Sequence, residues 1–371
     1  MTEPVKHVTE PAKIVDVRLG ERSYAIKIGS GILADTADTV ARHCPTWHVV
    51  LVTDQHVETP HAMTVAEHLA AAGLEVDVIV VPAGEVSKSV DTLAALWDKC
   101  LELGTDRKSI VAAVGGGVIG DLAGYLAASF ARGLRFVQVP TTLLAQVDSS
   151  VGGKVGINLT GAKNMVGAFW QPTAVLIDTQ VLTTLPERQY RAGLAEVIKY
   201  GVILDAKFFA YLEDNVDAIN RRQDDVLIDV IARCCQLKAD VVQQDEREET
   251  GLRAVLNYGH TFCHGLETVT GYQQLLHGEA VAIGMLCASR LAESLGRVDA
   301  EFTRRQQKLL EAVGLPTVVP DVDHQELIAA MRHDKKAEQG QMRFVLPTEM
   351  GHVELVEGVQ DSAVLAALKN T

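Results

Sequence analysis

Residues 109–124 read SIVAAVGGGVIGDLAG, an apolar strand pattern that runs directly into three glycines and then into a helical pattern. Glycines at the carboxyl end of a strand let the backbone approach a pyrophosphate, and a helix N-terminus offers free N–H groups and a positive dipole end. The pattern GGGxxGD differs from the dinucleotide motif GxGxxG, and a tight turn without a ligand explains it as well. The stretch predicts a strand–turn–helix unit and leaves its ligand open.

Strand and helix patterns alternate around this unit. Residues 13–29 predict one or two strands, and further β-branched runs occur at 46–53, 75–82, 134–140 and 174–178. Strands that alternate with helices predict a parallel, Rossmann-like sheet that is covered on both faces. The alternation stops near Leu185.

Helical periodicity dominates from residue 186 onward. Helices are expected at 187–202, 205–219, 224–243, 253–270, 278–295, 300–313 and 324–333. A β-hairpin is expected around Met350 and Gly351. The sequence therefore predicts two domains, an α/β domain over residues 1–185 and a mainly helical domain over residues 186–371.

The composition is that of an ordinary globular protein, with 371 residues, 47% hydrophobic and 22% charged. A net charge of −14 without a dense Lys/Arg run argues against nucleic acid as a partner. The N-terminus lacks the apolar region of a secretory signal, and no apolar run is long enough to cross a membrane. Six cysteines without a CxxC motif predict reduced thiols in a cytoplasmic protein.

Three histidines lie close together in the stretch LNYGHTFCHGLETVTGYQQLLHGEAVAIGM, residues 256–285. His260 and His264 are four positions apart, so on one helix they share a face, as two ligands of one metal ion can. His277 lies beside a glycine, where a new helix is expected to begin. The spacing alone predicts a metal site with His264 among its ligands, and ordinary helical histidines are the alternative.

Polar residues gather in DSSVGGKVGINLTGAKN, residues 148–164. The segment is too polar and glycine-rich for a core element, so it predicts a loop. Lys154 and Lys163 in such a loop suit an anionic, phosphorylated ligand, and a solvated surface loop is the alternative. Asp54, at the end of an earlier strand, could bind an adenosine ribose or cap a helix.

The segment GLAEVIKYG, residues 193–201, opens the helical half. Glu196 and Lys199 are three positions apart and so lie on one face of a helix. They predict either a surface ion pair or a metal-binding carboxylate with a cation beside it.

Several segments together resemble the 3-dehydroquinate synthase family. They are GGGVIGDLAG, ARGLRFVQVPTTLLAQVDSSVGGKVGIN, GAKN, GLAEVIKYG, LKADVVQQDERE, LNYGHTF, HGEAVAIGM and HDKKA, in the family's order across most of residues 54–340. The resemblance implies a dehydroquinate synthase-like fold and a carbon–oxygen lyase of the shikimate pathway. Such an enzyme converts 3-deoxy-D-arabino-heptulosonate 7-phosphate to 3-dehydroquinate and phosphate by NAD-dependent oxidation, phosphate elimination, re-reduction and aldol cyclisation.

The resemblance also implies a metal site. It gives a zinc (or cobalt) ion the ligands Glu196, His260 and His277. It reassigns His264, which becomes a residue that contacts substrate or transfers a proton, and it thereby corrects the prediction from spacing.

The family's substrate carries a carboxylate and a phosphate, and the resemblance implies a cationic and polar lining for it. The implied substrate contacts are Asp148, Lys154, Asn164, Lys199, Lys238, Arg253, Asn257, His264, Lys335 and Lys336. Of these, His264, Lys154, Asp148, Lys199 and Asn257 are implied to act in catalysis. Arg132 matches an arginine that reaches the neighbouring subunit's substrate site, which implies a homodimer.

The implied NAD contacts fall mainly in the first half of the chain. They are Asp54, Glu85, Lys88, Gly115, Gly116, Gly117, Val118, Gly120, Asp121, Thr141, Thr142, Lys154, Lys163, Leu182 and Thr184. The resemblance therefore makes residues 1–185 an NAD-binding domain, and residues 186–371 a domain that binds the metal and the substrate.

The chain departs from the family pattern at a few positions. Cys263 and Gly265 stand where most members have Gly and Ala, and the segment GEVSKS lacks the usual Gln-Tyr pair. The alternative functions are another sugar phosphate cyclase of secondary metabolism, a metal-dependent polyol dehydrogenase and a catalytically dead NAD-sensing protein. The cationic residues argue against the dehydrogenase, since a neutral polyol does not need them.

Overall fold

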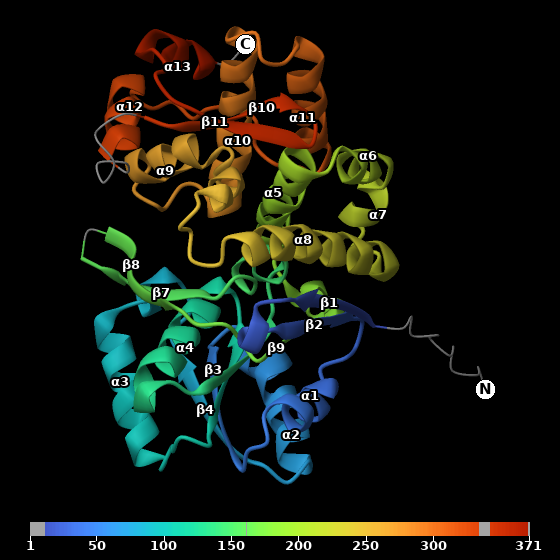
Figure 1. Cartoon of the computed structure of the whole chain (residues 1–371), viewed down its shortest axis with the longest axis vertical. Coiled ribbons are helices and arrows are strands. Elements are labelled where there is room, and N and C mark those ends of the chain that lie inside the picture. Colours follow the sequence, from blue (N-terminus) through green and yellow to red (C-terminus); the bar gives the residue numbers. More distant parts are fainter. Residues whose placement is uncertain (1–11, 161, 334–341, 370–371) are drawn as a thin grey trace, which may run out of the picture. The chain divides into compact units, whose positions relative to one another are not determined.

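The computed structural model describes residues 12–160, 162–333 and 342–369 (Figure 1). The chain divides into two compact units, Met1–Leu185 with Arg222–Gln243, and Pro186–Arg221 with Gln244–Thr371. Residues 222–243 therefore group with the first unit, whereas the sequence placed them in the second domain. Helix α8 (Asp224–Gln244) belongs there because Asp224 accepts hydrogen bonds from Ser30 Oγ at 2.9 Å and Thr179 Oγ1 at 3.0 Å.

The first unit is built on a seven-stranded sheet in the order β1-β2-β9-β6-β5-β3-β4. Every neighbouring pair is parallel except β1 and β2, so the prediction of a Rossmann-like sheet is confirmed with one antiparallel edge strand. The strands are Lys13–Val17 (β1), Tyr24–Gly29 (β2), His48–Asp54 (β3), Glu75–Val81 (β4), Ile110–Gly115 (β5), Arg135–Pro140 (β6) and Ala174–Asp178 (β9).

Helices cover both faces of this sheet because its central strands are apolar on both sides. In β3, Val49 and Leu51 pack in a core cluster with α1 and α2, and Val50 and Val52 pack in a second cluster with α3 and α4. Figure 1 shows the two helix pairs on opposite sides of the strands. The helices are Asp35–His43 (α1), Met63–Ala71 (α2), Val90–Glu102 (α3) and Gly117–Ser129 (α4).

The prediction of a loop over residues 148–164 is wrong for its second half. There, Lys154–Leu159 (β7) and Ala162–Phe169 (β8) form an antiparallel hairpin. Val155 and Ile157 alternate into the core cluster of α3 and α4, which is the pattern of a half-buried strand. Gly156 and Gly167 are paired across the hairpin, where a Cβ would lie 2.6 Å and 2.2 Å from backbone oxygens. These glycines permit close strands and do not mark a loop.

The second unit is mainly helical, as predicted, and contains the expected hairpin of Phe344–Glu349 (β10) and His352–Val356 (β11). Two expected helices are interrupted. The helix expected at 205–219 is divided at Asn215. The helix expected at 253–270 is divided into a short helical turn, Leu252–Asn257 (η7), and α9, and Gly259, with a φ of +79°, lies between them. The helices are Glu187–Leu204 (α5), Ala206–Asp214 (α6), Val216–Asn220 (α7), His260–Val269 (α9), His277–Ser294 (α10), Ala300–Ala312 (α11), His324–His333 (α12) and Asp361–Ala367 (α13).

Helix α10 is the centre of this unit and packs against α5, α9, α11, α13 and β10. Two glycines let it approach its neighbours closely. A Cβ on Gly278 would lie 1.8 Å from the backbone oxygen of Ala192 in α5, and a Cβ on Gly284 would lie 2.3 Å from that of Gly259. Of the helices in the described ranges, none is long and apolar enough to cross a membrane.

Candidate active site

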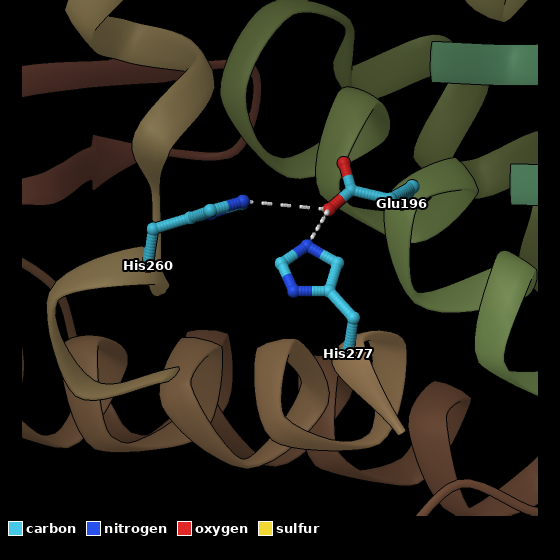
Figure 2. Close-up of side chains that lie close together, drawn as sticks. All are labelled: Glu196, His260 and His277. Atoms are coloured by element: carbon cyan, nitrogen blue, oxygen red, sulfur yellow. Dashed lines mark ion pairs between the residues drawn. The ribbon is translucent and has the colours of Figure 1, made fainter. Parts of the chain in front are cut away.

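Three side chains from three helices meet in the second unit (Figure 2). Glu196 of α5 points its Oε1 at Nε2 of His260, 3.7 Å away, and at Nε2 of His277, 4.0 Å away. One ligand atom from each residue lies within 4.8 Å of the others. The close packing of Gly278 on Ala192 explains this meeting. Ala192 is four positions before Glu196, on the same face of α5, and Gly278 follows His277.

The three residues fit a divalent metal ion. Glu196 is 1% exposed, yet its Oε1 accepts no hydrogen bond from the described residues. A buried carboxylate oxygen without a donor is costly unless a cation is bound there. The 3.7 and 4.0 Å separations are too long for hydrogen bonds, but they leave room for an ion with ligands at about 2.0–2.2 Å. One carboxylate and two imidazoles are a common ligand set of catalytic zinc.

The rear nitrogens of both imidazoles are held by acceptors. Nδ1 of His277 lies 3.2 Å from Oε1 of Glu267, and Nδ1 of His260 lies 3.2 Å from the backbone oxygen of Tyr258. Such acceptors hold the Nδ1 proton and so leave the Nε2 lone pair for a metal. No role was predicted for Glu267 from the sequence. Its position seven residues after His260 nevertheless places both residues on the same face of α9.

The surroundings shift the two histidines in opposite directions. Burial, together with the charge of Lys199 and the two neighbouring imidazoles, holds the pKa of His260 well below its ordinary value. Burial also opposes a charge on His277, but Cys263 and Glu267 beside Nδ1 outweigh it and raise that pKa well above the ordinary value. The lowered pKa favours the neutral form of His260, which is the form that binds a metal ion, whereas the raised pKa of His277 means that a proton competes with a metal ion there.

Lys199 and His264 flank the three residues. Lys199 is buried one turn after Glu196 and forms an ion pair with its other oxygen, Oε2. His264 packs its ring edgewise on His260, with centroids 5.6 Å apart, and does not belong to the group that can hold a metal. The prediction from spacing that His264 is a ligand is therefore wrong. Nε2 of His260, on α9, is directed to Glu196 on a different helix, α5.

Two further predicted residues of this unit, Arg253 and Asn257, lie on η7. Arg253 is buried, and it donates to the backbone oxygen of Glu246 at 2.9 Å and lies 3.5 Å from the Glu248 carboxylate. Asn257 is exposed at the end of η7. Lys335 and Lys336 lie outside the described residues.

The two departures at α9 face different neighbours. The Cys263 thiol lies 3.8 Å from Nδ1 of His277, and burial raises the pKa of this thiol. A Cβ on Gly265 would contact side chains of Leu327 and Met331 in α12. Neither residue displaces a member of the Glu196, His260 and His277 group.

In the first unit, the glycine turn joins β5 to α4 with little free space. The Thr141 N–H donates to the Gly115 oxygen at 2.9 Å, and a Cβ on Gly116 would lie 3.0 Å from Thr142 Cγ2. A Cβ on Gly120 would lie 2.9 Å from the side chain of Gln138. The structure thus brings together the residues of 115–121 and 141–142 that the sequence assigned to the cofactor.

A polar cluster lies beside this turn. Lys88 is 4% exposed, and its Nζ donates to Asp121 Oδ2 at 2.6 Å and to Asn164 Oδ1 at 2.5 Å. Burial raises the pKa of Asp121, and the Lys88 ammonium opposes this effect. Glu85 lies 3.8 Å from the same ammonium. Four predicted site residues therefore meet here, although 79 positions separate Glu85 from Asn164.

Other predicted residues of the first unit are more dispersed. Lys238 of α8 donates to Asp148, at 2.6 Å to Oδ1 and 2.7 Å to the backbone oxygen. Lys154 and Lys163 are exposed on the β7–β8 hairpin. The three lysines and Asp148 therefore lie in one unit. Of the predicted anion-binding residues, Lys238 is held directly by Asp148.

The other residues of the first unit that were predicted to contact a ligand are Asp54, Leu182, Thr184 and Arg132. Asp54 accepts from the His56 N–H at 2.8 Å, which is a local turn and not a helix cap. Leu182 is buried and Thr184 Oγ1 lies 2.7 Å from His61 Nε2. Arg132 is exposed, with a φ of +68°.

Comparisons with known proteins agree with this arrangement. Residues 78–192 match the family described as 3-dehydroquinate synthase N-terminal, and residues 193–337 match 3-dehydroquinate synthase C-terminal. A curated 3-dehydroquinate synthase of Rhodopirellula baltica is 50% identical over 368 residues, which cover 97% of this chain and 98% of that protein.

Two solved structures have the same fold. A 2-deoxy-scyllo-inosose synthase complexed with carbaglucose-6-phosphate, NAD+ and Co2+ has a TM-score of 0.88 and 26% identity, covering 96% of this chain and 99% of that chain. The 2-epi-5-epi-valiolone synthase of Streptomyces hygroscopicus, with NAD+ and Zn2+ bound, has a TM-score of 0.86 and 30% identity, covering 95% and 97%. The identity to the dehydroquinate synthase is much higher over an equal length, and with both halves matched we conclude that the chain belongs to the 3-dehydroquinate synthase family.

Proposed function

We propose that this chain is a 3-dehydroquinate synthase that converts 3-deoxy-D-arabino-heptulosonate 7-phosphate to 3-dehydroquinate and phosphate. The observation that carries the proposal is the buried Glu196 oxygen, which lacks a hydrogen-bond donor in the described chain and faces Nε2 of both His260 and His277. A merely structural carboxylate in such a position would be paired with a donor. The relatives' identity of about one residue in two supports the particular substrate.

Glu196, His260 and His277 would hold zinc or cobalt, and the ion would supply Lewis-acid polarisation of substrate oxygens. The chain's own contribution is to fix the ligands. Glu267 and the Tyr258 oxygen keep both Nε2 atoms toward Glu196, and Lys199 limits the negative charge on its second oxygen. His264, next to His260 but outside the ligand group, is positioned to contact substrate or transfer a proton.

The first unit would bind NAD, which supplies a hydride acceptor that is regenerated in each turnover. Gly115, Gly116 and Gly117 are suited to a pyrophosphate because the turn lacks side chains and opens helix α4. The cluster of Glu85, Lys88 and Asp121 lies beside the turn and provides polar groups of both charges.

The substrate is a phosphorylated sugar acid, so it needs cations. Lys154, Lys163 and Lys238 in the first unit, and Lys199 and Arg253 in the second, are the proposed cations within the described ranges. Asp148 orients Lys238 through two contacts to its ammonium. We also propose a homodimer in which Arg132 serves the neighbouring subunit, and a cytoplasmic location, which six cysteines without a CxxC motif support.

The test follows phosphate release and absorbance at 340 nm together, with NAD at one equivalent per chain. Many phosphates released per NAD without accumulating NADH, with activity lost on chelation and restored by zinc or cobalt, are the expected result. NADH that accumulates without phosphate release would identify a dehydrogenase instead. If another sugar phosphate turned over and the heptulosonate phosphate did not, the chain would be another sugar phosphate cyclase.

A further inference from the structure

Asn158, on the β7–β8 hairpin, lies between three residues to which the family resemblance assigns ligand contacts, Glu85, Lys88 and Asn164. Its Nδ2 donates to Glu85 Oε1 at 2.8 Å, and its Oδ1 accepts from the Asn164 N–H at 2.8 Å. Its own N–H donates to the Lys88 oxygen at 2.8 Å. No role was predicted for Asn158 from the sequence.

The contacts of Asn158 join segments that are far apart in the sequence. Glu85 and Lys88 belong to the turn after β4, and Asn164 lies on β8. One amide side chain with a donor and an acceptor can bridge a carboxylate and an N–H group at the same time. Few other side chains supply both groups at this length, since aspartate has no donor and leucine has neither.

The bridge controls the direction of two side chains that face ligands in the proposed function. Asn164 has a φ of +55°, in the left-handed region that asparagine adopts more readily than most side chains and that neighbouring contacts can stabilise. The bond from its N–H to Asn158 is such a contact, and its side-chain oxygen in turn accepts from Lys88. Lys88 thus has two of its three ammonium protons committed, to Asn164 and Asp121, and this fixes the direction of the third.

We propose that Asn158 is a positioning residue for nucleotide binding, which holds the Glu85–Lys88 turn and Asn164 in one fixed arrangement before NAD binds. A supporting residue of this kind raises affinity because the contacting groups need no ordering at the moment of binding. The inference rests on the proposed function, because NAD is the ligand that Glu85 and Lys88 are expected to meet, with Asn164 expected to contact the substrate.

The experiment measures the Kd for NAD by calorimetry, without sugar phosphate and at a temperature well below thermal unfolding. We expect Asn158→Ala to raise the Kd about tenfold, the scale of one lost hydrogen bond to a charged group. We expect Asn158→Asp to raise it further, because two carboxylates would then face each other. The backbone bond to Lys88 remains in both variants. Thr160→Ala, an exposed change in the same hairpin, is the matched control and should leave the Kd unchanged.

A double-mutant cycle tests the contact itself. Combining Asn158→Asp with Glu85→Gln restores a donor–acceptor pair with the direction reversed, so the double variant should bind NAD better than the product of the two single losses. A Kd unchanged in Asn158→Ala despite a lower melting temperature would show a merely structural role and overturn the inference. Independent, multiplicative losses would do the same for the bridge to Glu85. No NAD binding by the unmodified chain would instead overturn the proposed function, and the inference with it.

Discussion

Nδ1 of His277 lies 3.2 Å from Oε1 of Glu267, while Nε2 of the same ring faces Glu196 at 4.0 Å. One imidazole is therefore held on one side by a carboxylate that orients it and directed on the other to a carboxylate that can share a metal with it. Glu267 is itself 7% exposed and fixed on α9, the helix that carries His260. The metal-binding group is thus supported from within its own helices.

Replacement of Glu267 should weaken metal binding. We expect Glu267→Ala to lower zinc affinity by about 10- to 100-fold, the usual range for such outer contacts, and Glu267→Gln to lower it less because an amide oxygen still accepts from Nδ1. Competition against a chromogenic chelator at fixed pH measures this. Glu301→Gln, at an exposed position of α11, serves as the control. Wild-type zinc affinity in Glu267→Ala would show that His277 is oriented without it.

The two histidines of α9 should behave differently. We expect His260→Ala to lose stoichiometric metal, since it removes a ligand. His264→Ala should keep one metal ion per chain while its kcat falls by about 10²- to 10⁴-fold, the range for loss of a proton-transfer residue. Metal content per purified chain and phosphate release measure the two effects. A metal-free His264→Ala protein with a normal melting temperature would contradict this division of roles.

Gly278→Ala should destabilise the protein, although alanine is usually the better helix residue by about 1 kcal/mol. The new Cβ would lie 1.8 Å from the Ala192 oxygen, and backbone must move to admit it. We expect a loss of roughly 1–3 kcal/mol in the free energy of unfolding, with weaker metal binding because His277 is the adjacent residue. Gly265→Ala is the matched control, since its Cβ meets only the side chains of Leu327 and Met331 within 3 Å. Equal melting temperatures for the two variants would rule out close packing as the cause.

Glu279 should stabilise the start of α10 in a pH-dependent way. It accepts from the Leu276 N–H at 2.8 Å and binds Arg188 of α5 through both oxygens, each at 2.7 Å. Burial by itself would raise the pKa of Glu279, but Arg188 and the Leu276 N–H together hold it below the ordinary 4.5. A lowered folded pKa means that the stabilisation is complete above the unfolded pKa and is lost as pH falls through the folded one.

We therefore expect Glu279→Gln to be less stable than the unmodified chain by roughly 1 kcal/mol at pH 7, because the amide can still accept from the Leu276 N–H but loses the charge-assisted pair with Arg188. The difference should shrink below about pH 4.5. Denaturant unfolding at several pH values measures it. Glu187→Gln, which alters a more exposed ion pair with Arg191, should show a smaller effect at pH 7. A difference that is constant from pH 7 to pH 3 would exclude the carboxylate as its source.

The alternation of strands and helices predicted the sheet because its central strands are covered on both faces and so appear in the sequence as continuous apolar runs. In residues 49–52, successive side chains point to opposite faces of the sheet and all are buried. The hairpin of β7 and β8 escaped prediction for a physical reason. Gly156 looked like a loop residue, whereas it is a strand residue paired with Gly167, and neither glycine leaves room for a side chain. Glycine has several uses, and only the opposite strand decides among them.

The metal-binding group shows the same limit. Spacing on one helix pointed to His260 and His264, but the atoms that converge come from three helices. Sequence separation within a helix says which residues share a face, and it does not say which other helix that face meets. That depends on close contacts such as the one between Gly278 and Ala192, which involve a backbone atom and leave no pattern in the sequence. Glu196 and His277 were candidates from the sequence pattern, and the resemblance to a family chose them over His264.

The assignment of residues 222–243 to the first unit affects the order in which the chain can fold. A ribosome that has released residue 185 has made every strand of the large sheet but not α8, whose Asp224 and Lys238 bind Thr179 and Asp148. The first unit is complete only after residues 186–221 of the second have been synthesised, so its late contacts are non-local and slow to form. A gene cut at codon 185 would yield a first fragment that lacks α8 and a second fragment that carries α8 in addition to all residues of the second unit.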